Sequence, residues 1–270
     1  GDDPAARALM GKRVACWPTA GTHASHVNVP LDACIAIPDS ASIENASASF
    51  VNPVTALGFV GTMQRQGYEA LVHTAAASNL GQMLNRICQE DGIPSVSIVR
   101  RPEQVALLTG QGFRNVLDSS EAGFDAALID AIEATRAYCA FDAIAGGDMA
   151  GRILAAMERA ATRNAEFSRY GSAQRKHVYI YGRLDLSPTI LPPSIGFSWD
   201  LSAWLLFPYL QLVGPKESRA MSERVIAGID STFASHFSQR LSMEQVLEKA
   251  AALTINARRT GEKALILPAG

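Results

Sequence analysis

Residues 68–101, with the sequence YEALVHTAAASNLGQMLNRICQEDGIPSVSIVRR, hold the pattern that decides the fold. An apolar run at 70–73 leads into a turn of small residues, and 81–89 then shows apolar side chains at helical spacing. Gly92, Ile93 and Pro94 interrupt that helix before a second apolar run at 96–99. The order strand, tight turn, helix, strand predicts a βαβ unit of about thirty residues.

The turn before Gly81 is suited to a pyrophosphate. Unpaired N–H groups and the positive end of the helix dipole meet at the N-terminus of the expected helix. The second strand ends at Arg100 and Arg101. Arg100 lies nineteen positions after Gly81, close to the offset of about twenty at which a dinucleotide-binding fold contacts the ribose. An acid there would accept a hydrogen bond from the ribose 2′-hydroxyl of NAD, whereas two guanidinium groups favour the 2′-phosphate of NADP. We therefore expect NADPH.

This turn departs from the Gly-x-Gly-x-x-Gly pattern, since Ala75, Ala76, Ala77 and Ser78 stand where glycines are expected. A plain packing turn is one alternative. The arginine pair, taken alone, is equally compatible with a solvated strand end.

Beyond this unit, helical and strand patterns alternate. The expected helices are 52–65, 102–109, 124–135 and 149–161, and the expected strands are 115–117, 137–144 and 177–181. Alternation of this kind indicates right-handed crossovers and a parallel sheet. We therefore predict an α/β fold with a doubly wound parallel Rossmann sheet.

The two ends of the chain carry shorter patterns. Residues 1–49 suggest strands at 14–17, 26–29 and 33–37 between Gly and Pro breaks. Toward the C-terminus we expect a helix at 216–230, a strand-like run at 233–241, a helix from Ser242 through 252 and a strand at 263–267. Ser242 is placed to cap its helix, with Gln245 at the capping-box position.

The segments VHTAAASNLGQ (72–82) and SIVRRPEQVALLTGQGFRNVLDSS (97–120) closely resemble the cofactor domain of zinc-independent quinone oxidoreductase-like members of the medium-chain dehydrogenase/reductase superfamily. The resemblance runs from about Gly21 to the C-terminus. It includes NPVTALGF (52–59), CAFDAIAGG (139–147), HVYIYGRLD (177–185) and RRTGEKALILP (258–268).

The resemblance implies three parts of the chain. Residues 1–49 would be the C-terminal part of a GroES-like catalytic domain, 50–230 a Rossmann NADP-binding domain, and 231–270 a return to the catalytic domain. Partial GroES-like β segments would thus lie at both chain ends, and more of the catalytic domain would precede Gly1.

The resemblance also implies that the cofactor lies across the C-terminal ends of the strands, and it supplies candidate contacts. Asn52 and Thr55 would lie near the nicotinamide ribose or phosphate, and Ala145, Gly146 and Gly147 near a ribose. The pyrophosphate contacts would be Ser78, Asn79, Leu80, Gly81 and Gln82. Tyr181, Gly182 and Arg183 would lie beside the nicotinamide, and Arg259 on the phosphate side.

The composition and the motifs that are absent from the sequence argue against several classes of protein. The chain of 270 residues is 48% hydrophobic with a net charge of −2, which gives no general field for nucleic acid or an anionic membrane. It contains no run of about eighteen apolar residues, and Gly1-Asp2-Asp3 does not begin a signal peptide, so we expect a cytoplasmic protein. A Gly-x-Ser-x-Gly elbow and a P-loop are both absent.

A zinc alcohol dehydrogenase is a competing class, but we expect no metal site. Cys16, Cys34, Cys88 and Cys139 show no Cys-x-x-Cys spacing. His23 and His26 have no neighbouring acid or cysteine, so a surface or strand position suits them better than metal ligation.

Residues 195–212 are unusually aromatic, with Trp199, Trp204, Phe207 and Tyr209. Core packing is one explanation. We favour an edge strand that pairs with a second subunit, because monomers rarely expose such patches, and so expect a homodimer.

The resemblance implies an NADPH-dependent oxidoreductase that reduces quinones or α,β-unsaturated carbonyls by hydride transfer. Two alternatives stay open. One is a 2-enoyl-thioester reductase, for which the basic residues between Arg163 and Lys176 are the only hint. The other is a catalytically silent NADPH-binding sensor. No catalytic proton donor is assigned.

Overall fold

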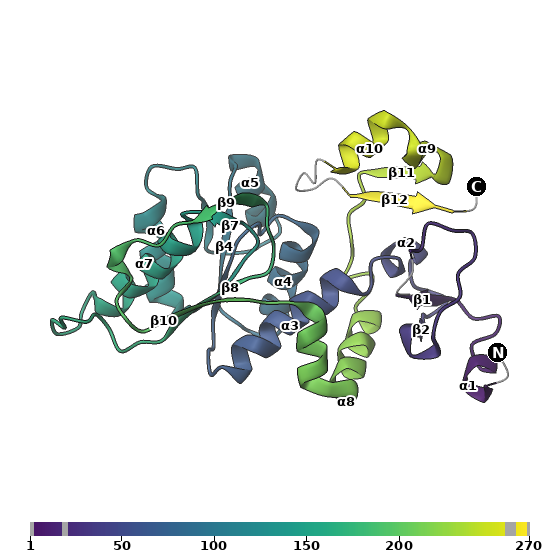
Figure 1. The fold of residues 1–270 in the computed structure, drawn as a ribbon, viewed down its shortest axis with the longest axis horizontal. Helices are drawn as coiled ribbons and strands as arrows, with labels where there is room; N and C mark the ends of the chain where they lie inside the picture. The colour runs from purple at the N-terminus through teal and green to yellow at the C-terminus, as the bar shows by residue number, and fades with distance from the viewer. Residues whose placement is uncertain (1–2, 18–20, 257–262, 269–270) are drawn as a thin grey trace. The chain divides into compact units, whose positions relative to one another are not determined.

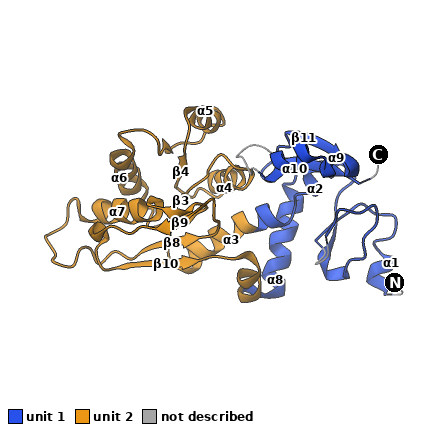
Figure 2. Cartoon of the chain, turned by 45° about the horizontal axis from the view of Figure 1, so that its top comes forward, with its two compact units in different colours: residues 1–54, 213–270 blue, residues 55–212 orange. Residues whose placement is uncertain are grey.

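A computed structural model describes residues 3–17, 21–256 and 263–268 (Figure 1). The chain divides into two compact units, which Figure 2 colours separately. Thr55–Leu212 form one unit, and Gly1–Val54 together with Val213–Gly270 form the other.

The unit Thr55–Leu212 contains a parallel six-stranded sheet with the order β10-β8-β6-β3-β4-β5. Its strands are β3 (Leu71–His73), β4 (Ser95–Val99), β5 (Val116–Asp118), β6 (Cys139–Asp142), β8 (Lys176–Ile180) and β10 (Trp199–Ala203). The first strand, β3, lies between β4 and β6, so the sheet grows outward from β3 in one direction and then in the other. This is the doubly wound order, with its switch point between β3 and β6. The predicted fold class is confirmed.

Helices cover both faces of this sheet. They are α3 (Val51–Arg65), α4 (Asn79–Glu90), α5 (Pro102–Gly110), α6 (Phe124–Thr135) and α7 (Met149–Thr162). Successive strand residues point to opposite faces. Val72 and Ala140 pack in one cluster with residues of α6 and α7, whereas Phe141 stacks on Phe59 of α3 with ring centroids 4.2 Å apart.

A small ribbon continues from the carboxyl ends of β6 and β8. In it, β7 (Ala145–Gly147) pairs in parallel with β9 (Asp185–Thr189). A 3₁₀ turn, η2 (Pro193–Ile195), then leads to β10.

Besides the helical residues 213–227, the other unit is built from short elements, with β1 antiparallel to β2 and β11 parallel to β12. They are α1 (Pro4–Arg7), β1 (Val14–Cys16), η1 (Leu31–Ala33), β2 (Cys34–Ala36), α2 (Ile43–Ala46), β11 (Gln239–Ser242), α9 (Met243–Leu247), α10 (Lys249–Asn256) and β12 (Ala264–Leu267). The Asp230 carboxylate accepts hydrogen bonds from the Ser42 N–H and the Asn45 side chain, which ties α2 to the end of a distant segment.

The aromatic segment 195–212 is not one strand. It is an edge strand only at β10, and α8 (Leu206–Ala227) begins three residues later. The helix is interrupted at Gly214, which has φ of 78° and is followed by Pro215. Trp204 and Tyr209 are buried against α3, so part of the aromatic content is core packing. Phe197 and Phe207 are exposed, with 80% and 63% of their surface accessible.

Other boundaries also differ from the sequence prediction. Residues 26–29 form no strand, and in the run 233–241 the strand begins only at Gln239. The predicted capping box of Ser242 and Gln245 is present. Its helix ends at Leu247 rather than at 252, because Glu248 has an extended backbone with ψ of 136°.

Candidate functional site

The switch point between β3 and β6 is held together by buried polar side chains. The Thr74 hydroxyl, directly after β3, donates to Asp142 Oδ1 over 2.7 Å and accepts the Ala143 N–H over 2.8 Å. The Asp142 carboxylate, at the end of β6, also accepts the N–H groups of Ile144 and Ala145. Both acid and hydroxyl are fully buried. The loops that follow β3 and β6 are therefore fixed to one another at their bases.

Two alanines beside this network have a left-handed backbone. Ala75, in the turn after β3, has φ of 51°, and Ala145, in the loop after β6, has φ of 69°. Residues other than glycine adopt this region at a cost of about 1–3 kcal/mol, and such positions gather at functional sites. The hydrogen bond from the Ala145 N–H to Asp142 Oδ2, 2.9 Å long, helps to hold the second of them.

The turn after β3 places the N-terminus of α4 at the switch point. Ser78 is the N-cap, and its hydroxyl accepts the Gly81 N–H over 3.1 Å. A Cβ on Gly81 would come within 2.5 Å of the Ala76 carbonyl oxygen, so only glycine permits this close turn. Gln82 fixes the same turn, because its side-chain amide donates to the Ala77 carbonyl. Asn79 and Leu80 begin the helix and are partly exposed.

Close backbone approach also explains two further glycines. A Cβ on Gly182, just after β8, would lie 2.7 Å from the Ala143 carbonyl oxygen, and one on Gly146 would lie 2.6 Å from that of Ser187. Gly147 has φ of 75°. These positions let the loops after β6 and β8 run side by side beyond the sheet, as the hydrogen bond from the Leu184 N–H to the Ala143 carbonyl shows.

Arg100 and Arg101 follow β4 directly and are exposed. The Arg101 guanidinium lies 3.7 Å from the Glu103 carboxylate, while among the described residues no acid pairs with the Arg100 side chain. The Arg100 N–H donates to the Gln104 side chain, which orders the start of α5. Two guanidinium groups thus lie at the carboxyl end of the strand next to β3.

Tyr181 and Arg183 follow β8. The Tyr181 ring packs on Phe59 with centroids 4.7 Å apart, and burial, with a contribution from the charge of Asp142, raises the pKa of its phenol. The phenol therefore stays neutral at physiological pH. Arg183 is exposed, and Thr55 is buried on α3.

The structure brings together most of the predicted cofactor contacts. Residues 78–82, 100–101, 145–147 and 181–183 all follow carboxyl ends of β3, β4, β6 or β8 within one compact unit. Asn52 belongs to the other unit. Arg259 lies outside the described residues. Their part in a cofactor site stays a prediction.

Sequence reasoning missed Thr74 and Asp142. Each occupies a position directly after, or at the end of, a buried strand, where a polar residue interrupts an apolar run. That interruption was the available signal, because the carboxyl ends of neighbouring parallel strands meet at one edge.

No group of three or more His, Cys, Asp or Glu side chains that could hold a metal ion is found within 3–17, 21–256 and 263–268. His23 and His26 are exposed. In the same part of the chain, no helix has the length and apolar character needed to cross a membrane.

The strand order, with its switch point between β3 and β6, defines a doubly wound, Rossmann-type protein. Family models and curated proteins give no match to the chain. Solved structures, in contrast, do match the chain. A protein from Mesorhizobium loti described as an NADPH:quinone reductase is 26% identical, with 99% of this chain and 74% of that chain covered and a TM-score of 0.77.

Two further structures show the same similarity. A protein from Bacillus thuringiensis, also described as an NADPH:quinone reductase, is 20% identical, with 96% and 74% covered and a TM-score of 0.74. The quinone oxidoreductase of Escherichia coli, solved as a complex with NADPH, is 19% identical, with 96% and 76% covered and a TM-score of 0.71. The chain has the fold of the medium-chain dehydrogenase/reductase superfamily, and its structural neighbours include proteins described as NADPH:quinone oxidoreductases and as enoyl reductases.

Proposed function

We propose that this protein is an NADPH-dependent oxidoreductase that reduces quinones or α,β-unsaturated carbonyls by hydride transfer. One observation carries the proposal: a dinucleotide-type switch point lies beside a strand, β4, that is followed directly by two exposed arginines, Arg100 and Arg101. The similarity to the Mesorhizobium loti protein described as an NADPH:quinone reductase supports the choice of acceptor.

The residues present fit a dinucleotide phosphate. The N-terminus of α4 offers the positive end of a helix dipole at the switch point, which favours a pyrophosphate there. Arg100 and Arg101 offer planar donors of the kind that bind phosphate, and an acid for a ribose 2′-hydroxyl is absent from these two positions. This donor set favours a 2′-phosphate over a free hydroxyl.

When bound, the reduced nicotinamide supplies the hydride. The chain's own residues hold the crevice in shape for that reaction, because geometry and exclusion of water are what hydride transfer asks of a protein. Thr74 and Asp142 fix the two loops, and Gly182 allows the loop after β8 to lie close to the end of β6. Tyr181 keeps its proton and adds no negative charge beside the reaction.

The test is consumption of reduced cofactor with a panel of acceptors. NADPH and NADH are each offered with quinones, enones and 2-enoyl thioesters, and the absorbance of the reduced nicotinamide is followed. We expect NADPH to be consumed with quinones or enones. Consumption with thioesters alone would identify a thioester reductase instead, and NADPH binding without consumption by any acceptor would identify a non-catalytic NADPH-binding protein.

We also propose a homodimer formed through β10. This strand ends the sheet, so one of its edges pairs with no other strand of the described residues, and the exposed Phe197, Leu205 and Phe207 flank it. The Trp204 N–H donates to the Ile180 carbonyl and the Ser198 carbonyl accepts the Lys176 N–H, so alternate residues of β10 bond to β8. By that alternation, the N–H of Ala203 faces the free edge.

Sedimentation of the chain at micromolar concentration tests this assembly. We expect a dimer for the wild-type chain and a folded monomer for Ala203→Pro, because proline removes a donor at the free edge and leaves the bonds to β8 in place. A monomeric wild-type chain would contradict the proposal. So would an Ala203→Pro variant that stays dimeric.

We further propose that residues 1–49 and 231–270 belong to one GroES-like catalytic domain and that 50–230 form the NADP-binding domain. The two-stranded pairs β1–β2 and β11–β12, which come from opposite ends of the chain within one compact unit, support this division. Limited proteolysis followed by mass spectrometry would locate the most accessible boundaries, and cleavage deep inside 55–212 before any near its ends would contradict it.

A further inference from the structure

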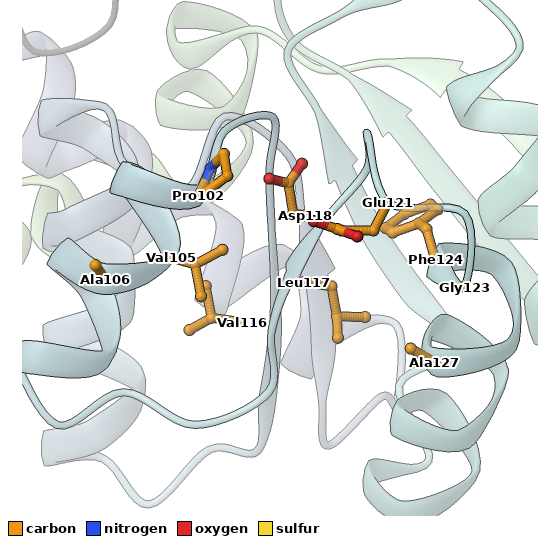
Figure 3. Close-up of a pocket in the computed structure, with 10 residues that line it drawn as sticks. All are labelled: Pro102, Val105, Ala106, Val116, Leu117, Asp118, Glu121, Gly123, Phe124 and Ala127. Carbon is orange, nitrogen blue, oxygen red and sulfur yellow. The ribbon is translucent and has the colours of Figure 1, made fainter.

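A pocket of about 570 Å³ lies between α5, β5 and α6, at the carboxyl end of β5 (Figure 3). Its lining includes Pro102, which follows Arg101, so the pocket adjoins the position proposed for the 2′-phosphate and belongs with that site. A feature of a different kind lies in the other unit, where two cysteines face one another across the β1–β2 pair.

Cys16 of β1 and Cys34 of β2 are direct partners in this antiparallel ladder. At the next position along it, the Trp17 N–H donates to the Ala33 carbonyl over 3.1 Å. Hydrogen-bonded and non-hydrogen-bonded pairs alternate along an antiparallel ladder, so the two cysteines form a non-hydrogen-bonded pair. The Cα atoms of such a pair are about 4.5 Å apart, and its side chains are the closer of the two kinds.

This spacing suits a disulfide. Disulfide-bonded cysteines have Cα atoms about 4.4–6.8 Å apart and Cβ atoms about 3.5–4.5 Å apart. The Cβ atoms of directly opposite residues are about 4.5–5.5 Å apart and closest in non-hydrogen-bonded pairs, so a small approach of the two strands is enough. A Cα separation at the short end of the range makes the bond strained, and a strained disulfide is readily reduced again.

The face of the ladder that carries the cysteines is partly exposed. Side chains alternate between the two faces of a strand. Ala15 and Ile35, the neighbouring pair, pack with Ala46 in a hydrophobic cluster, so the cysteines project from the opposite face. Both cysteines are intermediate in exposure, and Val14, on the same face, is 36% exposed. A small molecule can therefore reach this pair.

We propose that Cys16 and Cys34 form a reversible disulfide on reaction with a low-molecular-weight disulfide such as oxidised glutathione. The thiolate of one cysteine attacks a sulfur of the small disulfide, which forms a mixed disulfide and releases one thiolate. The other cysteine attacks the mixed disulfide and releases the second. In total the two cysteines lose two electrons and two protons, and the small disulfide gains them to become two thiols.

The surroundings of Cys34 slow this exchange near neutral pH. Burial, with contributions from Cys16 and Asp32, raises the pKa of the Cys34 thiol, and the thiolate is the reactive form. The cross-link closes the segment 17–33 into a loop and joins β1 to β2 until the bond is reduced. The proposal does not rest on the proposed hydride transfer.

Peptide mapping of the full chain tests the proposal. The folded protein is incubated with oxidised glutathione at about pH 8.5, near the ordinary pKa of a free cysteine. Acid then stops the exchange, and the remaining thiols are alkylated in urea. Trypsin cuts after Arg13, and Asp-N protease cuts before Asp32 and Asp39. The two cysteines then lie in separate peptides, 14–31 and 32–38. We expect these peptides to be joined, with a mass two hydrogens below their sum, and dithiothreitol to separate them.

The other cysteines and two variants supply the controls. Cys88 and Cys139 are buried in the unit Thr55–Leu212 and should be recovered as alkylated thiols. Cys16→Ser and Cys34→Ser should each lose the joined peptides and carry glutathione on the remaining cysteine of the pair. Three results in the wild-type chain would each overturn the proposal: glutathione on Cys16 or Cys34 without a bond between them, unreacted thiols at both positions, or a bond from either one to Cys88 or Cys139.

Discussion

Gly81 lies too close to neighbouring backbone to carry a side chain. Its Cβ would lie 2.5 Å from a backbone oxygen, which cannot move aside as a flexible side chain could. We predict that Gly81→Ala lowers the free energy of unfolding by about 1–3 kcal/mol, the usual cost of overpacking, and weakens NADPH binding because the turn must shift. Gly110→Ala is the control: this glycine also belongs to a helix of this unit, as the last residue of α5, but a Cβ there meets nothing within 4 Å. Urea unfolding that finds the two variants equally stable would contradict this explanation.

His73 gives a second prediction at this scale. The residue is fully buried, with Nε2 2.9 Å from Asn85 Oδ1, and burial lowers its pKa from 6.5 to about 4. The unfolded chain therefore binds more protons between those two values, and the free energy of unfolding falls as pH drops from 6.5 to 4. The full shift corresponds to about 3 kcal/mol.

Chemical unfolding of the wild-type chain and His73→Gln at a series of pH values isolates this contribution. The pKa of His177 is also lowered by burial, so the wild-type chain has more than one such group and the difference between the two proteins is the informative quantity. The variant should lose less stability on acidification. Parallel pH profiles for the two proteins would refute the assignment to His73.

Among the elements, helices and strands were predicted most accurately where the hydrophobic periodicity and the turn-forming residues agree. The βαβ unit of β3, α4 and β4 has a strongly one-sided helix between two apolar runs, and α6 was placed at the residues it occupies, 124–135. Prediction failed where packing between elements decides the conformation. The sequence of 195–212 predicted one edge strand. In the structure a helix follows β10, and Trp204 and Tyr209 are buried against α3. Those contacts are long-range and leave no local pattern.

The contact between α3 and Trp204 carries a prediction of its own. A Cβ on Gly58 would lie 2.7 Å from the indole ring, whose nitrogen donates to the Thr62 hydroxyl over 2.8 Å. Gly58→Ala should therefore lower the free energy of unfolding by about 1–3 kcal/mol, despite the better helix propensity of alanine. In a Trp204→Leu background the same change should be neutral or stabilising, and the double-mutant cycle measures the coupling. Equal costs in both backgrounds would show that the close approach does not limit packing.

At the scale of the whole molecule, the location of the candidate site could be predicted from the sequence, but not all of the contacts within it. Strand ends of a doubly wound sheet must meet at one edge, so residues 78–82, 100–101, 145–147 and 181–183 could be grouped from sequence. The strand-end positions of Thr74 and Asp142 were also readable from sequence, but the bond between them was not, because it is a single hydrogen bond between residues 68 positions apart. The pocket at β5 escaped notice for the same reason: its walls come from three elements that a linear pattern does not connect.

The central claim is that Arg100 and Arg101 make the crevice selective for a 2′-phosphate. Equilibrium titration of NADPH and NADH, followed by nicotinamide fluorescence, measures it in the wild-type chain, in Arg100→Ala/Arg101→Ala and in Arg114→Ala, an exposed arginine before β5 at the other end of the sheet. Each charge-assisted bond contributes about 1.5–3 kcal/mol, so the double variant should bind NADPH more than tenfold more weakly while its affinity for NADH stays the same. Arg114→Ala should match the wild type. An unchanged NADPH dissociation constant in the double variant, or equal wild-type affinity for the two cofactors, would contradict the account.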